Sequence, residues 1–129
     1  MERYKLEEVM SGRETDCVWV TLGFSSPLCA NDVLHIVRGP ARDDESSTRG
    51  MAGLYLERFE QGYSCYGGVE HIAATPLSVR VRLTEKGRTA LDFANTDIWF
   101  DVSNDLAKYD DALAALQQMM RSNQTNLGK

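Results

Sequence analysis

The fold of this chain is decided by the stretch Leu77-Ser78-Val79-Arg80-Val81-Arg82-Leu83. Its apolar and polar residues alternate one by one, and a β-strand points successive side chains to opposite faces. We therefore predict a strand whose apolar face meets a core, while the side carrying Arg80 and Arg82 faces water or a partner.

The same period of two recurs on both sides of this stretch and predicts further strands. They cover residues 18–24, 34–37, 54–57, 64–72 and 97–102, and an edge strand is predicted over 4–9. Two helices are predicted as well. One is short, runs over 84–91 and is weakened by Gly87. The other closes the chain, with an apolar stripe at three- and four-residue steps formed by Leu106, Tyr109, Leu113, Leu116 and Met120.

Many strands followed by a last helix favour an α+β fold. We expect a twisted, mainly antiparallel sheet of about six strands with the C-terminal helix packed on one face. Asn104 or Asp105 is predicted to cap this helix, and Arg121 suits its C-terminal dipole. A chain of 129 residues is long enough for one hydrophobic core, so a single domain is expected over 1–129. Residues 40–50 are predicted as a surface loop, and residues 122–129 as a frayed tail.

The composition narrows the possible partners. The formal net charge is −5, and an acidic domain is repelled by nucleic acid and by anionic membranes. No stretch is apolar over the length that a membrane helix needs, and the first residues are charged, so we expect no signal peptide and a cytoplasmic location. The 3 cysteines are an odd number and widely spaced, which predicts reduced thiols.

The sequence lacks the usual marks of an enzyme. It has no phosphate-binding loop, no dinucleotide fingerprint and no Cys-x-x-Cys pair, so we expect no metal, no cofactor and no catalysis. Cys65 and His71 could form a nucleophile and base only if the fold joined them; a core thiol and a surface histidine are the plainer interpretation. The acidic runs at 43–45 and 110–111 lack the spacing of a calcium loop and are interpreted as solvated charges.

The least generic segment is Gly62-Tyr63-Ser64-Cys65-Tyr66-Gly67-Gly68-Val69. Glycine weakens a strand unless the backbone must bulge, bend or pass close to another segment. Gly67 and Gly68 are therefore predicted as structural glycines at a bulge or sharp bend, with a direct binding contact as the alternative.

Residues 54–120 resemble the immunity protein 10 family of bacterial polymorphic toxin systems. The resemblance lies in Leu54-Tyr55-Leu56, the Tyr63–Val69 element, the alternating strand over 77–83, Thr84 with Leu91, Ile98-Trp99-Phe100 and the closing helix. It implies a small cytoplasmic protein that binds and neutralises a cognate toxin without catalysis. It does not identify the toxin, because one fold can serve several functions.

The first predicted toxin-binding surface is centred on Trp99. Six aspartates fall between residues 92 and 111, where Lys108 is the only positive charge. A tryptophan flanked by Asp97 and Asp101, with Asp105 nearby, has the make-up of an interface anchor with steering charges for a basic partner. In the alternative interpretation Trp99 packs into a second small core and the acids only face solvent.

Arg80, Arg82 and Tyr66 form a second, competing candidate surface. Arginine and tyrosine are favoured at interfaces, and this surface could meet an acidic toxin or a second copy in a homodimer. The competing function is a small homo-oligomeric structural or regulatory module without catalytic activity. An enzyme using Cys65 or the acids is a remote third.

Overall fold

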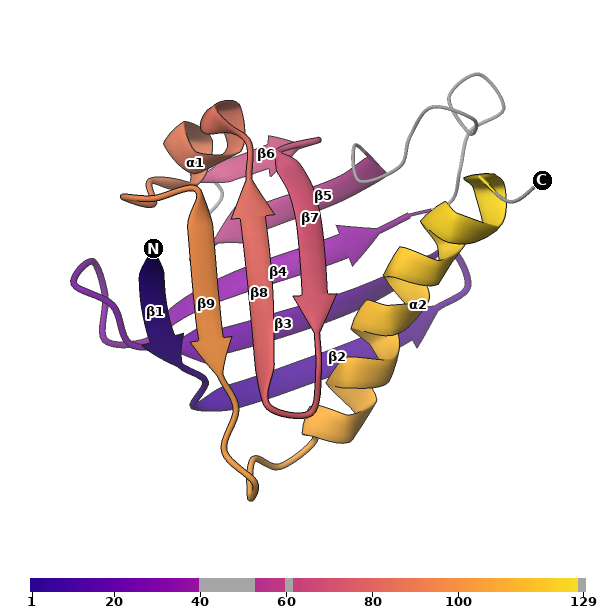
Figure 1. Ribbon diagram of the computed structural model, residues 1–129, viewed down its shortest axis with the longest axis horizontal. Helices are drawn as coiled ribbons and strands as arrows, with labels where there is room; N and C mark the ends of the chain where they lie inside the picture. Colours follow the sequence, from indigo (N-terminus) through magenta and orange to yellow (C-terminus); the bar gives the residue numbers. More distant parts are fainter. Residues whose placement is uncertain (40–52, 60–61, 128–129) are drawn as a thin grey trace.

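The computed structural model of the chain describes residues 1–39, 53–59 and 62–127, with side chains as far as Met120 (Figure 1). The predicted loop over 40–50 lies outside these residues. The predicted α+β class is confirmed. In the described part the strands are β1 (Glu2–Lys5), β2 (Glu8–Glu14), β3 (Cys17–Phe24), β4 (Asp32–Arg38), β5 (Leu54–Arg58), β6 (Ser64–Tyr66), β7 (Val69–Ala74), β8 (Ser78–Leu83) and β9 (Asp97–Asp101), and the helices are α1 (Glu85–Leu91) and α2 (Tyr109–Leu127).

The strands divide between two sheets. The front sheet has the order β1-β9-β8-β7, and the back sheet has the order β2-β3-β4-β5-β6. All neighbouring strands are antiparallel except β1 and β9, which are parallel. Figure 1 shows the front strands crossing over the back strands, with α2 beside them. The sequence predicted one sheet; alternation marks the inward residues but does not assign a strand to a sheet.

The predicted edge strand over 4–9 is two strands in different sheets. β1 pairs with β9 in the front sheet, and β2 pairs with β3 in the back sheet. The chain changes sheet at Leu6 and Glu7, whose backbone N–H groups donate to the carbonyls of Asp101 and Gly23. Leu6 is buried at this corner, so the change of sheet also fills the core.

The predicted strand over 64–72 is likewise divided between the sheets. β6 pairs with β5 in the back sheet, and β7 pairs with β8 in the front sheet. Gly67 between them has a φ of 70°, in the left-handed region that glycine adopts without strain. Gly68 follows and lies against α1. The two glycines therefore form the bend at which the chain leaves one sheet for the other.

One hydrophobic core lies between the sheets. The alternating strands point their apolar residues into it, and α2 adds its buried stripe along β2, β3 and β7. The largest fully buried side chains are Phe24, Phe100, Leu6, Leu22, Leu34, Ile36, Leu54, Leu56, Ile72, Leu83, Leu91 and Ile98. The outward faces of both sheets are left for solvent or partners.

The short helix predicted over 84–91 is α1, which begins one residue later at Glu85; Thr84 is its N-cap and accepts a hydrogen bond from the N–H of Gly87. The start predicted for α2 is wrong. Lys108 has a φ of 69°, which interrupts the helical backbone, so α2 begins at Tyr109 and neither Asn104 nor Asp105 caps it. α2 continues to Leu127 through most of the tail that was expected to fray.

Candidate functional site

The outward residues of the front sheet bring together the two surfaces that the sequence predicted as competitors. Arg3 is paired with Trp99 in the register of β1 and β9, and Trp99 is paired with Arg80 in the register of β9 and β8. The three side chains therefore form one cross-strand row on the outside of the sheet. We call the outward residues of this sheet the Trp99 face.

Trp99 lies between two arginines. The guanidinium carbon of Arg3 is 5.5 Å from the ring centroid of Trp99, and that of Arg80 is 5.6 Å from it. Both distances are within the range of a cation–π interaction. The indole Nε1 donates to Oδ1 of Asp101 at 3.2 Å. The half-buried indole is thus held on the surface by three side chains and does not enter the core.

Each arginine is in turn fixed by a carboxylate. Arg3 donates from Nε and Nη2 to Asp101 at 2.7 and 2.8 Å, and Arg80 donates from Nε and Nη2 to Asp97 at 2.8 and 2.7 Å. These hydrogen bonds hold the pKa of both carboxyl groups below its ordinary value. Two-pronged pairs of this kind orient a guanidinium as well as neutralise it. Asp97 and Asp101 are therefore engaged within the face.

The charges left over on the Trp99 face are mainly positive. Lys5 and Arg82 are exposed beside the paired groups, and Glu70 is exposed at a bulge of β7. The Trp99 face thus carries four cationic side chains and three carboxylates, although the net charge of the whole protein is −5. An acidic patch on a partner would complement this excess.

Four other predicted site residues lie elsewhere. Tyr66 is on β6 of the back sheet and is 69% exposed, so it is not adjacent to Arg80 and Arg82 as the sequence suggested. Asp105 is exposed in the turn before α2. Gly67 and Gly68 occupy the bend between the sheets, where Gly68 contacts the backbone of α1.

The structure does not bring together Cys65 and His71, the nucleophile and base that the sequence left as an alternative. Cys65 is buried on the back sheet, whereas His71 is exposed on the front sheet. No group of three or more His, Cys, Asp or Glu among the described residues could hold a metal ion. An open hollow of about 590 Å³ at the start of α2 is lined by Pro76, Val102, Ser103, Asn104, Leu106, Lys108, Tyr109, Asp110 and Asp111.

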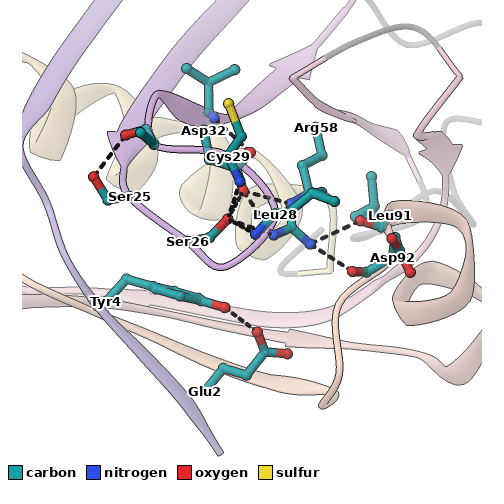
Figure 2. Close-up of polar contacts among 12 residues, drawn as sticks. Glu2, Tyr4, Ser25, Ser26, Leu28, Cys29, Asp32, Arg58, Leu91 and Asp92 are labelled. Atoms are coloured by element: carbon teal, nitrogen blue, oxygen red, sulfur yellow. Dashed lines mark hydrogen bonds and ion pairs between the residues drawn. The ribbon is translucent and has the colours of Figure 1, made fainter.

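A buried ion pair that the sequence did not predict links two neighbouring strands of the back sheet, β4 and β5 (Figure 2). Arg58 donates to Asp32 from Nε at 2.9 Å and from Nη2 at 2.7 Å, and the two residues are 2% and 0% exposed. Arg58 Nη1 also donates to the carbonyls of Leu91 and Asp92 at the end of α1. Its guanidinium lies 3.9 Å from the ring centroid of Phe93.

Further hydrogen bonds extend this network, and the backbone N–H of Val33 donates to the other carboxylate oxygen of Asp32, Oδ1, at 2.9 Å. Ser26 donates to Asp32 at 2.7 Å and accepts from the N–H groups of Leu28 and Cys29. The alternation of the two strands did contain a signal for this pair. Asp32 and Arg58 both fall at positions whose side chains point inward, where the neighbouring inward residues of β4 and β5 are apolar. Since its charges are buried and already paired, we interpret the network as a structural clamp between β4, β5 and α1.

Among the described residues, no helix has the length and apolar character needed to cross a bilayer. Comparison with known proteins gives no match to a family model, to a curated protein or to a solved structure. The resemblance to the immunity protein 10 family therefore stays a prediction from the residues.

Proposed function

We propose that this chain is an immunity protein, which binds a cognate toxin domain in the cytoplasm and neutralises it by covering its working surface. The binding surface in this proposal is the Trp99 face. The observation that carries it is Trp99 held outside the core between the ion-paired Arg3 and Arg80.

This arrangement has the properties of an interface anchor. Tryptophan and arginine dominate the residues that contribute most to protein–protein affinity. A side chain already fixed in its bound position loses less conformational entropy on association. The three side chains come from different strands of one sheet, so their spacing is set by the backbone register. A face whose side-chain spacing is fixed in this way suits occlusion of a partner's surface.

The electrostatics change the expected partner. The sequence suggested steering of a basic toxin by Asp97 and Asp101. Because both carboxylates are paired with arginines, the exposed cationic side chains of Lys5 and Arg82 favour an acidic patch on the toxin.

The experiment is co-expression with the C-terminal domain of any large secreted protein encoded next to this gene. The proposal predicts rescued growth and a complex that co-purifies. Trp99→Ala should weaken the complex by at least about 2 kcal/mol, roughly thirtyfold in Kd, as for an anchor residue. The double variant Arg80→Glu/Arg82→Glu should weaken it as well. Leu28→Ala is the matched control, because it truncates an exposed apolar side chain outside the Trp99 face.

Circular dichroism and thermal melting of each variant separate lost binding from lost folding. A large drop in melting temperature for Trp99→Ala would show that the indole is needed for stability. Growth that wild-type protein fails to rescue, or a complex unchanged by both Trp99 face variants, would contradict the proposal. Self-association lost in the arginine double variant would favour the homo-oligomeric module.

A further inference from the structure

One row of outward residues crosses all five strands of the back sheet, and three of its five residues are aromatic. The register places Gly12 beside Trp19, Trp19 beside Val37, Val37 beside Tyr55, and Tyr55 beside Tyr66. Residues directly opposite one another on neighbouring strands share a face. We call the outward residues of this sheet the aromatic face.

Close contacts define this row. A Cβ placed on Gly12 would lie 2.5 Å from the ring of Trp19, so the indole lies directly over the glycine backbone. The rings of Tyr55 and Tyr66 lie 4.8 Å apart between centroids. Tyr66 is 69% exposed. The aromatic face therefore holds Trp19 over Gly12 and, beyond Val37, the adjacent rings of Tyr55 and Tyr66, and its outer end at Tyr66 is open to solvent.

The charged groups on the aromatic face are acidic. Glu57 accepts a hydrogen bond from the hydroxyl of Tyr55 at 2.8 Å. Glu8 and Glu14 are exposed at the other edge, on β2. The outward residues of these five strands include no lysine or arginine. This face thus has the opposite charge from the Trp99 face.

Aromatic rings beside a carboxylate favour a cationic partner. The negative face of a ring attracts ammonium and guanidinium groups, and a nearby carboxylate adds to the attraction. Two copies meeting through this same face would bring their glutamates together, and nucleic acid would bring phosphate against them. Charge complementarity therefore selects a basic segment of a partner protein.

We propose that the aromatic face binds a cationic polypeptide segment, with a lysine or arginine side chain over the rings of Tyr55 and Tyr66 and beside Glu57. This site lies on a different sheet from the Trp99 face, so it does not depend on the proposed immunity function.

The test uses NMR titration of the isotope-labelled full chain with two blocked hexapeptides. One alternates arginine with valine and the other alternates glutamate with valine. Amide shifts confined to the back sheet are expected with the arginine peptide only. Tyr66→Ala and Glu57→Gln should each weaken this binding by about three- to tenfold. Thr89→Ala, on α1 and outside both faces, should leave it unchanged.

The test uses two variants because Tyr66→Ala could disturb the fold. Glu57→Gln preserves the shape of the side chain and removes only its charge, so it tests binding even in that case. Three results would overturn the proposal. They are the absence of shifts on the back sheet, equal shifts with the glutamate peptide, and shifts centred on the Trp99 face. Self-association without peptide that disappears in Tyr66→Ala would assign the face to a second copy and would also overturn it.

Discussion

Gly87→Ala tests the packing of α1 because two physical effects predict opposite results. Alanine in a helix interior is more stable than glycine by roughly 0.8–1.0 kcal/mol, so helix propensity alone predicts a gain. The fold predicts a loss, because Gly87 lies against the backbone of Gly68. A Cβ on Gly87 would lie 2.2 Å from the carbonyl oxygen of Gly68 and 2.9 Å from its Cα.

The size of the loss follows from these contacts. Ordinary contact begins at 3.4 Å, so α1 would have to move away by roughly 1 Å. That movement stretches the hydrogen bond from the N–H of Thr84 to the carbonyl of Gly68, which is 2.9 Å long. Overpacking costs about 1–3 kcal/mol, and a weakened hydrogen bond costs about 1 kcal/mol more. After the gain in helix propensity is subtracted from these costs, the free energy of unfolding should fall by about 1–3 kcal/mol.

Urea denaturation followed by circular dichroism measures this change. Thr89→Ala is the control, because Thr89 is exposed on the same helix and its replacement should change the free energy of unfolding by no more than about 0.5 kcal/mol. A Gly87→Ala protein as stable as the wild type, or more stable, would refute the close packing of α1 on Gly68.

Three further predictions concern the polar groups. Arg58→Met should lower the free energy of unfolding by about 3–5 kcal/mol, since Asp32 would remain buried without its partner. Urea denaturation should show a smaller loss for the double variant Arg58→Met/Asp32→Leu, because it removes both charges. An equal loss in the two proteins would contradict this account. The hydrogen bond from Arg80 lowers the pKa of Asp97 below its ordinary value of 3.8, so the stability it contributes is present above about pH 4 and is lost as the pH falls through the folded-state pKa. NMR titration of the carboxyl carbon should place its midpoint below 3.8, and Arg80→Ala should raise it; a midpoint that Arg80→Ala leaves unchanged would exclude this cause. Burial raises the pKa of Tyr109 to about 12, so its contribution to stability is present below about pH 10 and is lost as the pH rises toward the folded-state value. Phenolate absorbance should lose a component that titrates near pH 12 in Tyr109→Phe, and loss of a component that titrates near pH 10 instead would refute the shift.

The strands were the part of the fold that the sequence predicted best. The inward residues of β3, β8 and β9 follow from alternation alone, because a strand with one buried face must alternate. The division into two sheets could not be predicted in this way, since both sheets point their apolar residues into the same core. For the same reason Trp99 and Arg80 were placed on competing surfaces, although β8 and β9 are neighbours.

The remaining differences have local causes. Leu106 fits the apolar stripe of α2, but the positive φ of Lys108 separates it from the helix. Asp32 and Arg58 are charged residues in inward positions, and only their pairing across β4 and β5 makes such burial tolerable. Sequence patterns do not contain that pairing, because it depends on which strands are adjacent.

The parallel pairing of β1 with β9 has a consequence for protein synthesis. The residues that hold Trp99 from one side, Arg3 and Asp101, are 98 positions apart in the chain. At about 5–20 residues per second, Arg3 waits on the order of 5–20 s after its translation for Asp101 to be added. The Trp99 face of a nascent chain therefore cannot assemble until β9 has emerged from the ribosome. A partner that recognises this face can bind only chains whose translation has passed that point.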